Sequence, residues 1–284
     1  MAVDEMTGDA RMPSRYEIRP LGLEHLEWTK ALFAHSFIFG SPIWRALYPH
    51  DRTARFYGLY QSSHLVLKHQ LASGLSLGIF DTEYVFRNPD SAATGGALYL
   101  DPTDVAADEE ELLRQMDTPL VSIACAFDAF FAIDPRHVAP VMARLPACIS
   151  FYDALEASGG GEGGCKAPSA PGQVLQRMGT ATRADAEGAG LMRALAYYMM
   201  RRAAEIGFRH IRIDCLHDAV AAVWSDPPSP FTATVACEVD ACKLELELEP
   251  QKTLSPAQGD ERGTRKFPRQ KVRQRLAKVY VTLC

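Results

Sequence analysis

Residues Arg183 to Cys215 read RADAEGAGLMRALAYYMMRRAAEIGFRHIRIDC. Gly188 and Gly190 precede a long stretch with helical spacing, Gly207 ends that stretch, and an alternating apolar pattern then predicts a strand. A further strand is predicted just before, over residues 173–182 (QVLQRMGTAT). The first amides of a helix are unpaired, and glycines let an anion approach them closely. The order of strand, glycine turn and helix therefore favours an anion-binding turn.

Pyrophosphate is the anion that this turn would suit, but the two common phosphate motifs do not fit. The turn lacks the Gly-Lys-Ser/Thr of a P-loop and the third glycine of a dinucleotide fingerprint. It resembles the cofactor loop of the GNAT acyltransferase superfamily, Gln/Arg-x-x-Gly-x-Gly/Ala, which matches the stretch from Asp185 to Gly190. The resemblance runs from YEIRPL at residues 16–21 to LAKVYVTL at residues 276–283. Within that superfamily, the chain most resembles fungal GNAT-like proteins whose substrates are unassigned.

The resemblance implies a mixed α/β fold: a central twisted, mostly antiparallel sheet flanked by helices, with a helical insertion before the cofactor strand. We expect a flexible tail over residues 1–15 and one domain over 16–284, with the insertion at about 105–172. The patterns predict strands at 16–21, 75–86, 95–101, 173–182, 210–216, 231–239, 243–249 and 276–283. They predict helices at 22–39, 51–74, 104–116, within 119–158, at 190–206 and at 217–224, with 41–49 as a connection and 157–172 as a mobile loop.

The resemblance also implies acetyl-CoA, or another acyl-CoA, with its pyrophosphate on the amides of residues 186–191. The pantetheine arm would pair with the edge of residues 179–182, as an added strand does. The implied cofactor-binding residues are Gly179, Thr180, Ala181, Thr182, Arg183, Ala186, Glu187, Gly188, Ala189, Gly190, Leu191 and Trp224.

Three positions depart from the family pattern. Asp185 stands where GNATs have Gln or Arg, and its charge would oppose an anion unless Arg183 offsets it. His217 stands where the family often has Asn. Trp224 stands where it often has a Tyr that protonates the leaving thiolate, a step that an indole N–H cannot perform.

Acyl transfer to an amine needs a group that accepts the amine proton and a donor for the developing oxyanion. The donor is expected among the backbone amides from Thr180 to Thr182. The candidate catalytic residues are His217, Asp214, Asp81 and Glu83. A solvated strand-edge side chain is the alternative for each carboxylate, and a helix cap is the alternative for His217.

Composition limits the other possibilities. The chain has 284 residues and a formal net charge of -5, which disfavours nucleic acid as a partner of the whole chain. Seven scattered cysteines indicate free thiols, and no second Cys or His pair follows Cys237 and Cys242, so no metal is expected. The sequence shows no secretory pattern and no apolar run of membrane-spanning length, so we expect a cytoplasmic protein without a membrane partner. The expected partner is a small-molecule substrate, with a homodimer left open.

Acyl-CoA-dependent N-acyl transfer to a small-molecule amine is the function that these features favour. The alternative is a GNAT fold that no longer acylates and instead binds a ligand or performs another acid–base step, such as cyclisation or elimination. A nucleic-acid partner or scaffold would use the basic run at residues 262–278. The GLSLG pattern at residues 74–78 follows a predicted helix, whereas a hydrolase elbow needs a strand before its serine.

Overall fold

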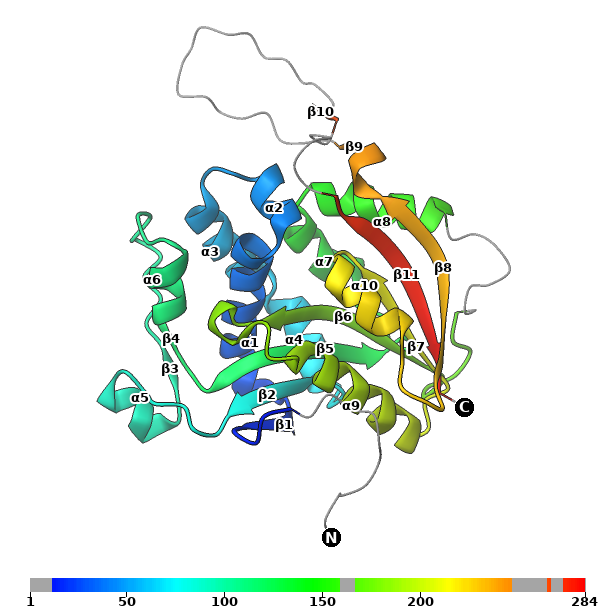
Figure 1. Cartoon of the computed structure of the whole chain (residues 1–284). Helices are drawn as coiled ribbons and strands as arrows, with labels where there is room; N and C mark the ends of the chain where they lie inside the picture. Colours follow the sequence, from blue (N-terminus) through cyan, green and yellow to red (C-terminus); the bar gives the residue numbers. More distant parts are fainter. Residues whose placement is uncertain (1–11, 159–166, 247–264, 267–272, 284) are drawn as a thin grey trace, which may run out of the picture.

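The structure is a computed structural model that describes residues 12–158, 167–246, 265–266 and 273–283 (Figure 1). The strands are β1 (Tyr16–Pro20), β2 (Leu77–Asp81), β3 (Ala97–Leu98), β4 (Met116–Asp117), β5 (Leu120–Asp128), β6 (Val174–Thr182), β7 (His210–Cys215), β8 (Thr232–Asp240), β9 (Glu245–Leu246), β10 (Arg265–Lys266) and β11 (Arg275–Thr282). The α-helices are α1 (Leu26–His35), α2 (Pro42–Leu47), α3 (Arg52–Ser62), α4 (His64–Ala72), α5 (Pro89–Thr94), α6 (Glu109–Arg114), α7 (Pro135–Met142), α8 (Ala147–Ser158), α9 (Leu191–Glu205) and α10 (Asp218–Ser225).

Seven strands form the central sheet, in the order β1-β2-β5-β6-β7-β11-β8. Every neighbouring pair in it is antiparallel except β6 and β7. These two parallel strands pair only from Val174 opposite His210 to Arg177 opposite Ile213. Beyond Arg177, β6 continues to Thr182 beside β5 but has no partner on its β7 side. The expected mixed α/β fold with a mostly antiparallel sheet is confirmed.

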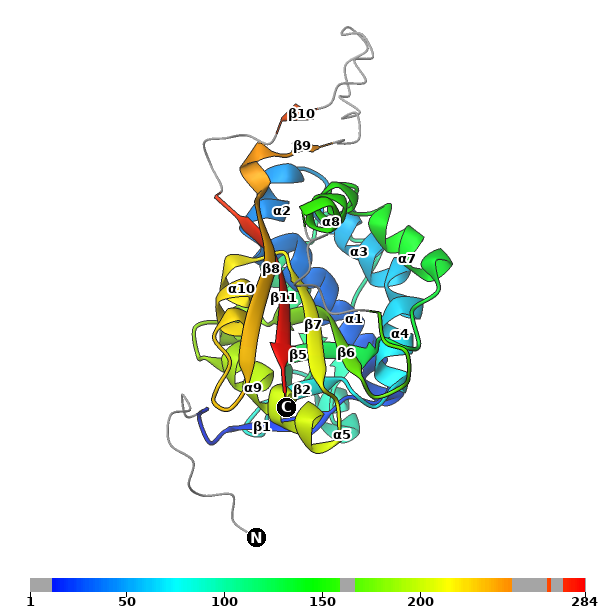
Figure 2. The same ribbon diagram turned by 90° about the vertical axis from the view of Figure 1, so that its right-hand side faces the viewer.

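Helices cover both faces of this sheet (Figures 1 and 2). Helices α9 and α10 pack on one face, against the inward residues of β7 and β11 such as Ile211, Ile213 and Val279. The other face carries α1 to α4, α7 and α8. The alternating HIRIDC of β7 buries every second residue on the α9 side, as its pattern predicts.

Two helical predictions need revision. The predicted helix over residues 51–74 is two helices, α3 and α4, separated at Ser63, whose hydroxyl donates to the Tyr60 carbonyl. Competition of this kind from a serine hydroxyl weakens the helix ladder. The predicted connection at 41–49 contains α2, which starts at Pro42, a residue whose fixed φ suits the first helical position.

The apolar run after Pro119 is also different from our expectation. Its first part is the strand β5, in the middle of the sheet and buried on both faces, and only α7 and α8 are helical. A continuous apolar run without alternation suits a doubly covered strand as well as a helix. The segment at 105–172 is therefore not wholly helical. The strands predicted at 75–86 and 95–101 are expected to form a hairpin, as neighbours in the sequence often do, but β2 pairs with β1 and β5 while β3 pairs with β4.

Several expectations fall outside the described residues. These are the tail before Met12, part of the loop at 157–172, residues 247–249 of the strand predicted at 243–249 and much of the basic run at 262–278. Within the described residues, no helix has both the length and the apolar character that crossing a bilayer requires.

Candidate active site

A cavity of about 980 Å³ opens where β6 and β7 diverge. Its walls include residues of both sheet faces: Leu191 and Val223 from the α9 and α10 side, and Trp44 and Phe127 from the opposite side. Because the parallel pairing stops at Arg177 and Ile213, the cavity reaches through the sheet. The missing strand pairing thus creates the space in which a ligand can bind.

The glycine turn lies at one end of this cavity. Gly188 and Gly190 have φ angles of 77° and 75°, the left-handed region that glycine adopts most readily. A Cβ built on either residue would meet no atom within 4 Å. Helix α9 begins at Leu191, and within the described chain the amides of residues 188–193 donate to no acceptor. The turn is open and its amides are available to an anion.

The charge of Asp185 is compensated beside this turn. Arg183 Nη2 lies 2.8 Å from Asp185 Oδ2, so the offset expected between these two residues is present. Arg193 projects from the first turn of α9, lines the cavity and forms no ion pair with any described residue. Glu187 lines the same rim. Arg193 is therefore the cation best placed to meet an anion bound at the turn.

The predicted cofactor-binding residues are mostly brought together. Nine of them line the cavity: Gly179, Thr180, Ala181, Thr182, Ala186, Glu187, Gly188, Gly190 and Leu191. Arg183, Ala189 and Trp224 are not among the lining residues. Open amides at the turn and an unpaired edge on β6 suit a phosphate-bearing arm that carries amide groups, so the chain's residues fit an acyl-CoA.

Arg177 lines the cavity and packs against the buried Trp224 behind it. Trp224 is 1% exposed, and the Arg177 guanidinium carbon lies 5.6 Å from its ring centroid. Arg177 is 2% exposed and lines the cavity, and no described carboxylate pairs with it. Burial lowers the pKa of Arg177 to about 10, so it remains a cation at neutral pH. Trp224 thus contributes through Arg177 rather than by lining the cavity, contrary to our expectation.

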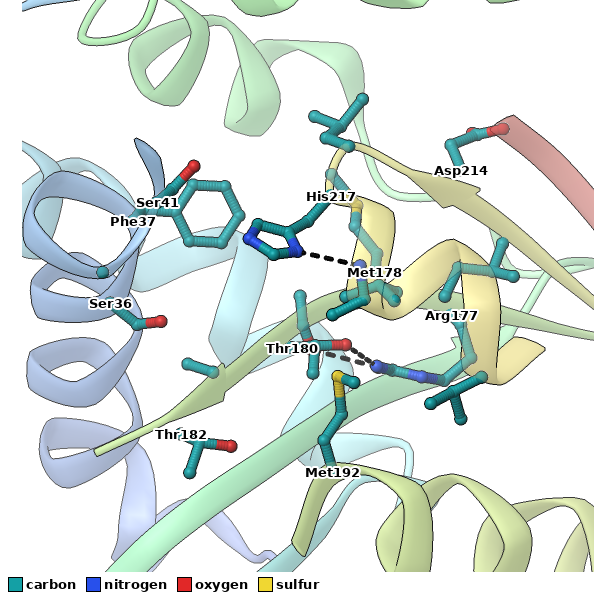
Figure 3. A pocket seen from close by; sticks show the side chains of 18 of the residues that line it. Ser36, Phe37, Ser41, Arg177, Met178, Thr180, Thr182, Met192, Asp214 and His217 are labelled. Atoms are coloured by element: carbon teal, nitrogen blue, oxygen red, sulfur yellow. Dashed lines mark hydrogen bonds between the residues drawn. The ribbon is translucent and has the colours of Figure 1, made fainter. Parts of the chain in front are cut away.

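His217 lines the cavity and also caps α10. Its Nδ1 accepts a hydrogen bond from the Ala219 amide at 3.1 Å. Burial lowers the pKa of His217, so the neutral ring is favoured. Because Nδ1 accepts, the proton of the neutral ring is on Nε2. The close-up in Figure 3 shows the ring directed away from α10 toward the region of Phe37. His217 is therefore arranged as a hydrogen-bond donor and is poorly arranged as a base.

Asp214 is the carboxylate that the fold brings to the cavity. It lies on β7 directly opposite Lys278 of β11, and Lys278 Nζ is 3.9 Å from Asp214 Oδ1. Lys278 forms its closer ion pair with Glu156 of α8. The Asp214 side chain is 20% exposed. Burial raises its pKa, although Lys278 and Arg212 act in the opposite direction. A carboxyl group with a raised pKa in a cavity is a good acceptor for a proton.

Asp81 and Glu83 lie elsewhere. Arg15 donates two hydrogen bonds to Asp81, at 3.1 and 2.5 Å, at the far end of the sheet where β1 pairs with β2. Neither Asp81 nor Glu83 lines the cavity. The sequence pattern does not show where β2 lies in the sheet relative to β6 and β7. It therefore could not show that Asp81 and Glu83 lie away from the cavity while Asp214 lines it.

Aromatic side chains form the wall opposite α9. Phe37, Trp44, Phe127 and Tyr152 all line the cavity, from η2 (Ser36–Gly40), α2, β5 and α8. With Asp214 and Glu156 at the same end, this chamber offers an apolar wall beside carboxylates. Such a combination suits an amine with an apolar body.

Sequence reasoning missed Arg177, Arg193 and two residues of the aromatic wall, Phe37 and Trp44. An arginine inside the apolar strand VLQRMGT could have been noticed, because a charge in a buried strand needs an explanation. Arg193, three residues after Gly190, could have been found from its place in the first helical turn. Within the described residues, no group of three or more His, Cys, Asp or Glu side chains is arranged to hold a metal ion.

No protein-family model and no curated protein sequence matches this chain. Solved structures do match its fold. The C-terminal condensation domain of Ebony, in complex with beta-alanyl-dopamine, is 16% identical with a TM-score of 0.50, over 93% of this chain and 97% of that one. Arylalkylamine N-acetyltransferase 2 from Aedes aegypti is 10% identical with a TM-score of 0.51, over 95% and 100%. A putative arylalkylamine N-acetyltransferase 7 from the same mosquito is 11% identical with a TM-score of 0.54, over 94% and 86%.

These neighbours establish the fold class. The chain has a mixed α/β structure with a large, mostly antiparallel sheet flanked by helices, like these GNAT-fold proteins. At 10 to 16% identity the likeness extends to the fold and not to the activity.

Proposed function

We propose that this protein transfers an acyl group from acyl-CoA to the nitrogen of a small-molecule amine. The observation that carries the proposal is one continuous cavity that joins the open glycine turn, the unpaired edge of β6 and Asp214. One structural neighbour is an arylalkylamine N-acetyltransferase and another is a putative one, and the aromatic wall near Asp214 suits an amine with an aromatic body.

The residues have distinct tasks in this proposal. The amides of residues 188–193 and the Arg193 guanidinium hold the diphosphate, and the edge of residues 178–182 holds the arm. Acyl-CoA supplies an activated thioester. Asp214 accepts the proton that the amine must lose, and His217 Nε2–H and the β6 amides donate to the developing oxyanion. The aromatic wall excludes water from the amine.

Calorimetric titration with acetyl-CoA tests the proposal. The wild-type protein should bind, and Gly188→Arg should abolish binding because the new side chain fills the turn. Gly74→Arg is the matched control: Gly74 has a φ of 72°, has no atom within 4 Å of a built Cβ, and lies outside the cavity. Both substitutions strain the backbone equally, so only a difference in binding reports the site.

Two outcomes would contradict the proposal. Absence of binding at millimolar acetyl-CoA would favour a GNAT-fold protein that does not acylate. Equal binding by both glycine variants would show that the ligand binds away from the turn. A thiol-release assay with a panel of arylalkylamines, performed on the wild type, then tests the acceptor class.

A further inference from the structure

The Arg177 cation has a specific geometry that the proposed function does not yet use. Its Nη1 donates to the carbonyl oxygens of Cys125 and Gly179, the latter at 3.0 Å, and its Nη2 donates to Thr180 Oγ1. Its Nε is buried and has no hydrogen-bond partner among the described residues. An entering anion cannot reach the Nε edge of the guanidinium without a rearrangement, because that edge is covered. Within the described chain, the Thr180 hydroxyl is the side-chain group that this guanidinium holds by a hydrogen bond.

Thr180 stands at the middle of the unpaired edge of β6, between Met178 and Thr182. It is partly exposed and lines the cavity. The Thr180 oxygen accepts a hydrogen bond from Arg177, so the hydroxyl proton of Thr180 points away from Arg177. In the described chain this hydroxyl donates to no acceptor. A hydroxyl that accepts from a cation is a stronger donor through its own O–H. Figure 3 shows the Thr180 oxygen directed toward Arg177, with His217 above and Met192 below in this view.

We propose that the Thr180 hydroxyl, oriented and strengthened by the buried Arg177 cation, donates a hydrogen bond to the sulfur that leaves during acyl transfer. The inference rests on the proposed function and supplies the group that Trp224 cannot provide. Thr180 is the catalytic residue in this inference, and Arg177 is a positioning residue. Trp224 holds the guanidinium from the other side.

The bonds and protons balance without full proton transfer from Thr180. The carbon–nitrogen bond forms and the carbon–sulfur bond breaks, and the electron pair of the broken bond stays on sulfur. Asp214 takes the proton that the amine releases. Thr180 keeps its proton and stabilises the thiolate by a hydrogen bond, and water protonates the sulfur after release.

The test measures the thiol pKa of CoA bound to the protein, by the ultraviolet absorbance of its thiolate as pH is raised. In the wild type this thiol pKa should lie about one unit below that in Thr180→Val, a tenfold change in the dissociation constant of the proton. Thr180→Ser keeps the hydroxyl and should restore the wild-type value. Arg177→Gln should raise the thiol pKa in the same direction as Thr180→Val.

Thr234→Val is the matched control, since Thr234 is also a strand threonine but lies on β8, is exposed and does not line the cavity. This variant should leave the thiol pKa of bound CoA unchanged. The inference is overturned if Thr180→Val and the wild type bind CoA with the same thiol pKa, or if Thr180→Ser fails to restore it. Should Arg177→Gln not fold, the Thr180 and Thr234 variants still test the inference. If the wild type does not bind CoA at all, that result contradicts the proposed function rather than this inference.

Discussion

Asp214 and Asp81 place the same carboxyl group in two different surroundings. Asp81 receives two hydrogen bonds from Arg15 at the far end of the sheet. Asp214 has one oxygen without a hydrogen-bond partner and a lysine 3.9 Å away that pairs more closely with Glu156. Burial raises the pKa of Asp214, so its ionised form is disfavoured in the folded protein. The carboxylate whose ionised form is disfavoured is therefore Asp214, the one that lines the cavity.

Asp214→Asn should lower turnover at least 100-fold, because the amide cannot accept the amine proton. Because the pKa of Asp214 is raised in the folded protein, its protonated form contributes to the free energy of unfolding. This contribution is lost as pH rises through the folded-state pKa. The neutral amide avoids that loss, so the variant should melt at neutral pH no lower than the wild type. Turnover of the wild type should fall as pH drops through the Asp214 pKa, which lies above the ordinary value for aspartate.

Asp81→Asn serves as the matched control for this carboxylate, because Asp81 lies outside the cavity. It should keep wild-type turnover while losing its charged partner Arg15. Assays of turnover against pH and thermal melts of both variants check the pair. Equal turnover of Asp214→Asn and the wild type would exclude Asp214 as the base.

Single site residues could be predicted from the sequence where their role depends on backbone conformation. Gly188 and Gly190 were found because positive φ and open amides follow from glycine at a helix start. Asp81 was indistinguishable from Asp214, since both follow apolar strand residues and only the order of strands separates them. Arg177 was missed because its role depends on Thr180 and Trp224, which meet it only in the folded chain.

At the scale of an element, α10 combines a structural and a chemical task at its N-cap residue, His217. The His217 ring both caps the helix and faces the cavity. His217→Ala should destabilise the protein by about 1 kcal/mol through loss of the cap and should also lower turnover. His217→Asp should restore the stability, because an Asp side chain caps well, and should leave turnover low, because a carboxylate has no hydrogen to donate. Thermal melts and acyl-transfer assays on both variants separate the two tasks; full recovery of turnover in His217→Asp would show that capping is the whole role.

The elements differ in how well sequence alone could place them. Strand β7 and helix α9 were predicted closely, because alternation and helical spacing show one apolar face each. Strand β5 was mistaken for part of a helical region, because LVSIACAFD is buried on both faces and has no polar side to reveal its period. The pairing of β3 with β4 depends on a contact that no local pattern encodes.

The two halves of the central sheet are joined at the short parallel contact between β6 and β7. On one side lie β1, β2 and β5, and on the other lie β11 and β8. In the described part of the chain, four residue pairs link β6 to β7. A ligand that contacts both β6 and the helices α9 and α10 should stabilise the pairing of β6 with β7 against opening.

Hydrogen exchange should therefore slow at the β7 amides of residues 210–213 when acetyl-CoA binds. At a ligand concentration 100 times its dissociation constant, linkage adds about 2.7 kcal/mol to any opening that expels the ligand. The β2 amides of residues 77–81, which pair with β1 at the other end of the sheet, serve as the internal control and should change less. Unchanged exchange at 210–213 would contradict the idea that the ligand bridges the joint.

The unpaired edge of β6 has a consequence for how such a protein can evolve. Main-chain N–H and C=O groups are present whichever side chains surround them. A binding site built largely from them tolerates substitution along the strand, provided the chain path and the two glycines persist. Chains that keep this strand could therefore differ widely in sequence and still present the same main-chain groups to a ligand.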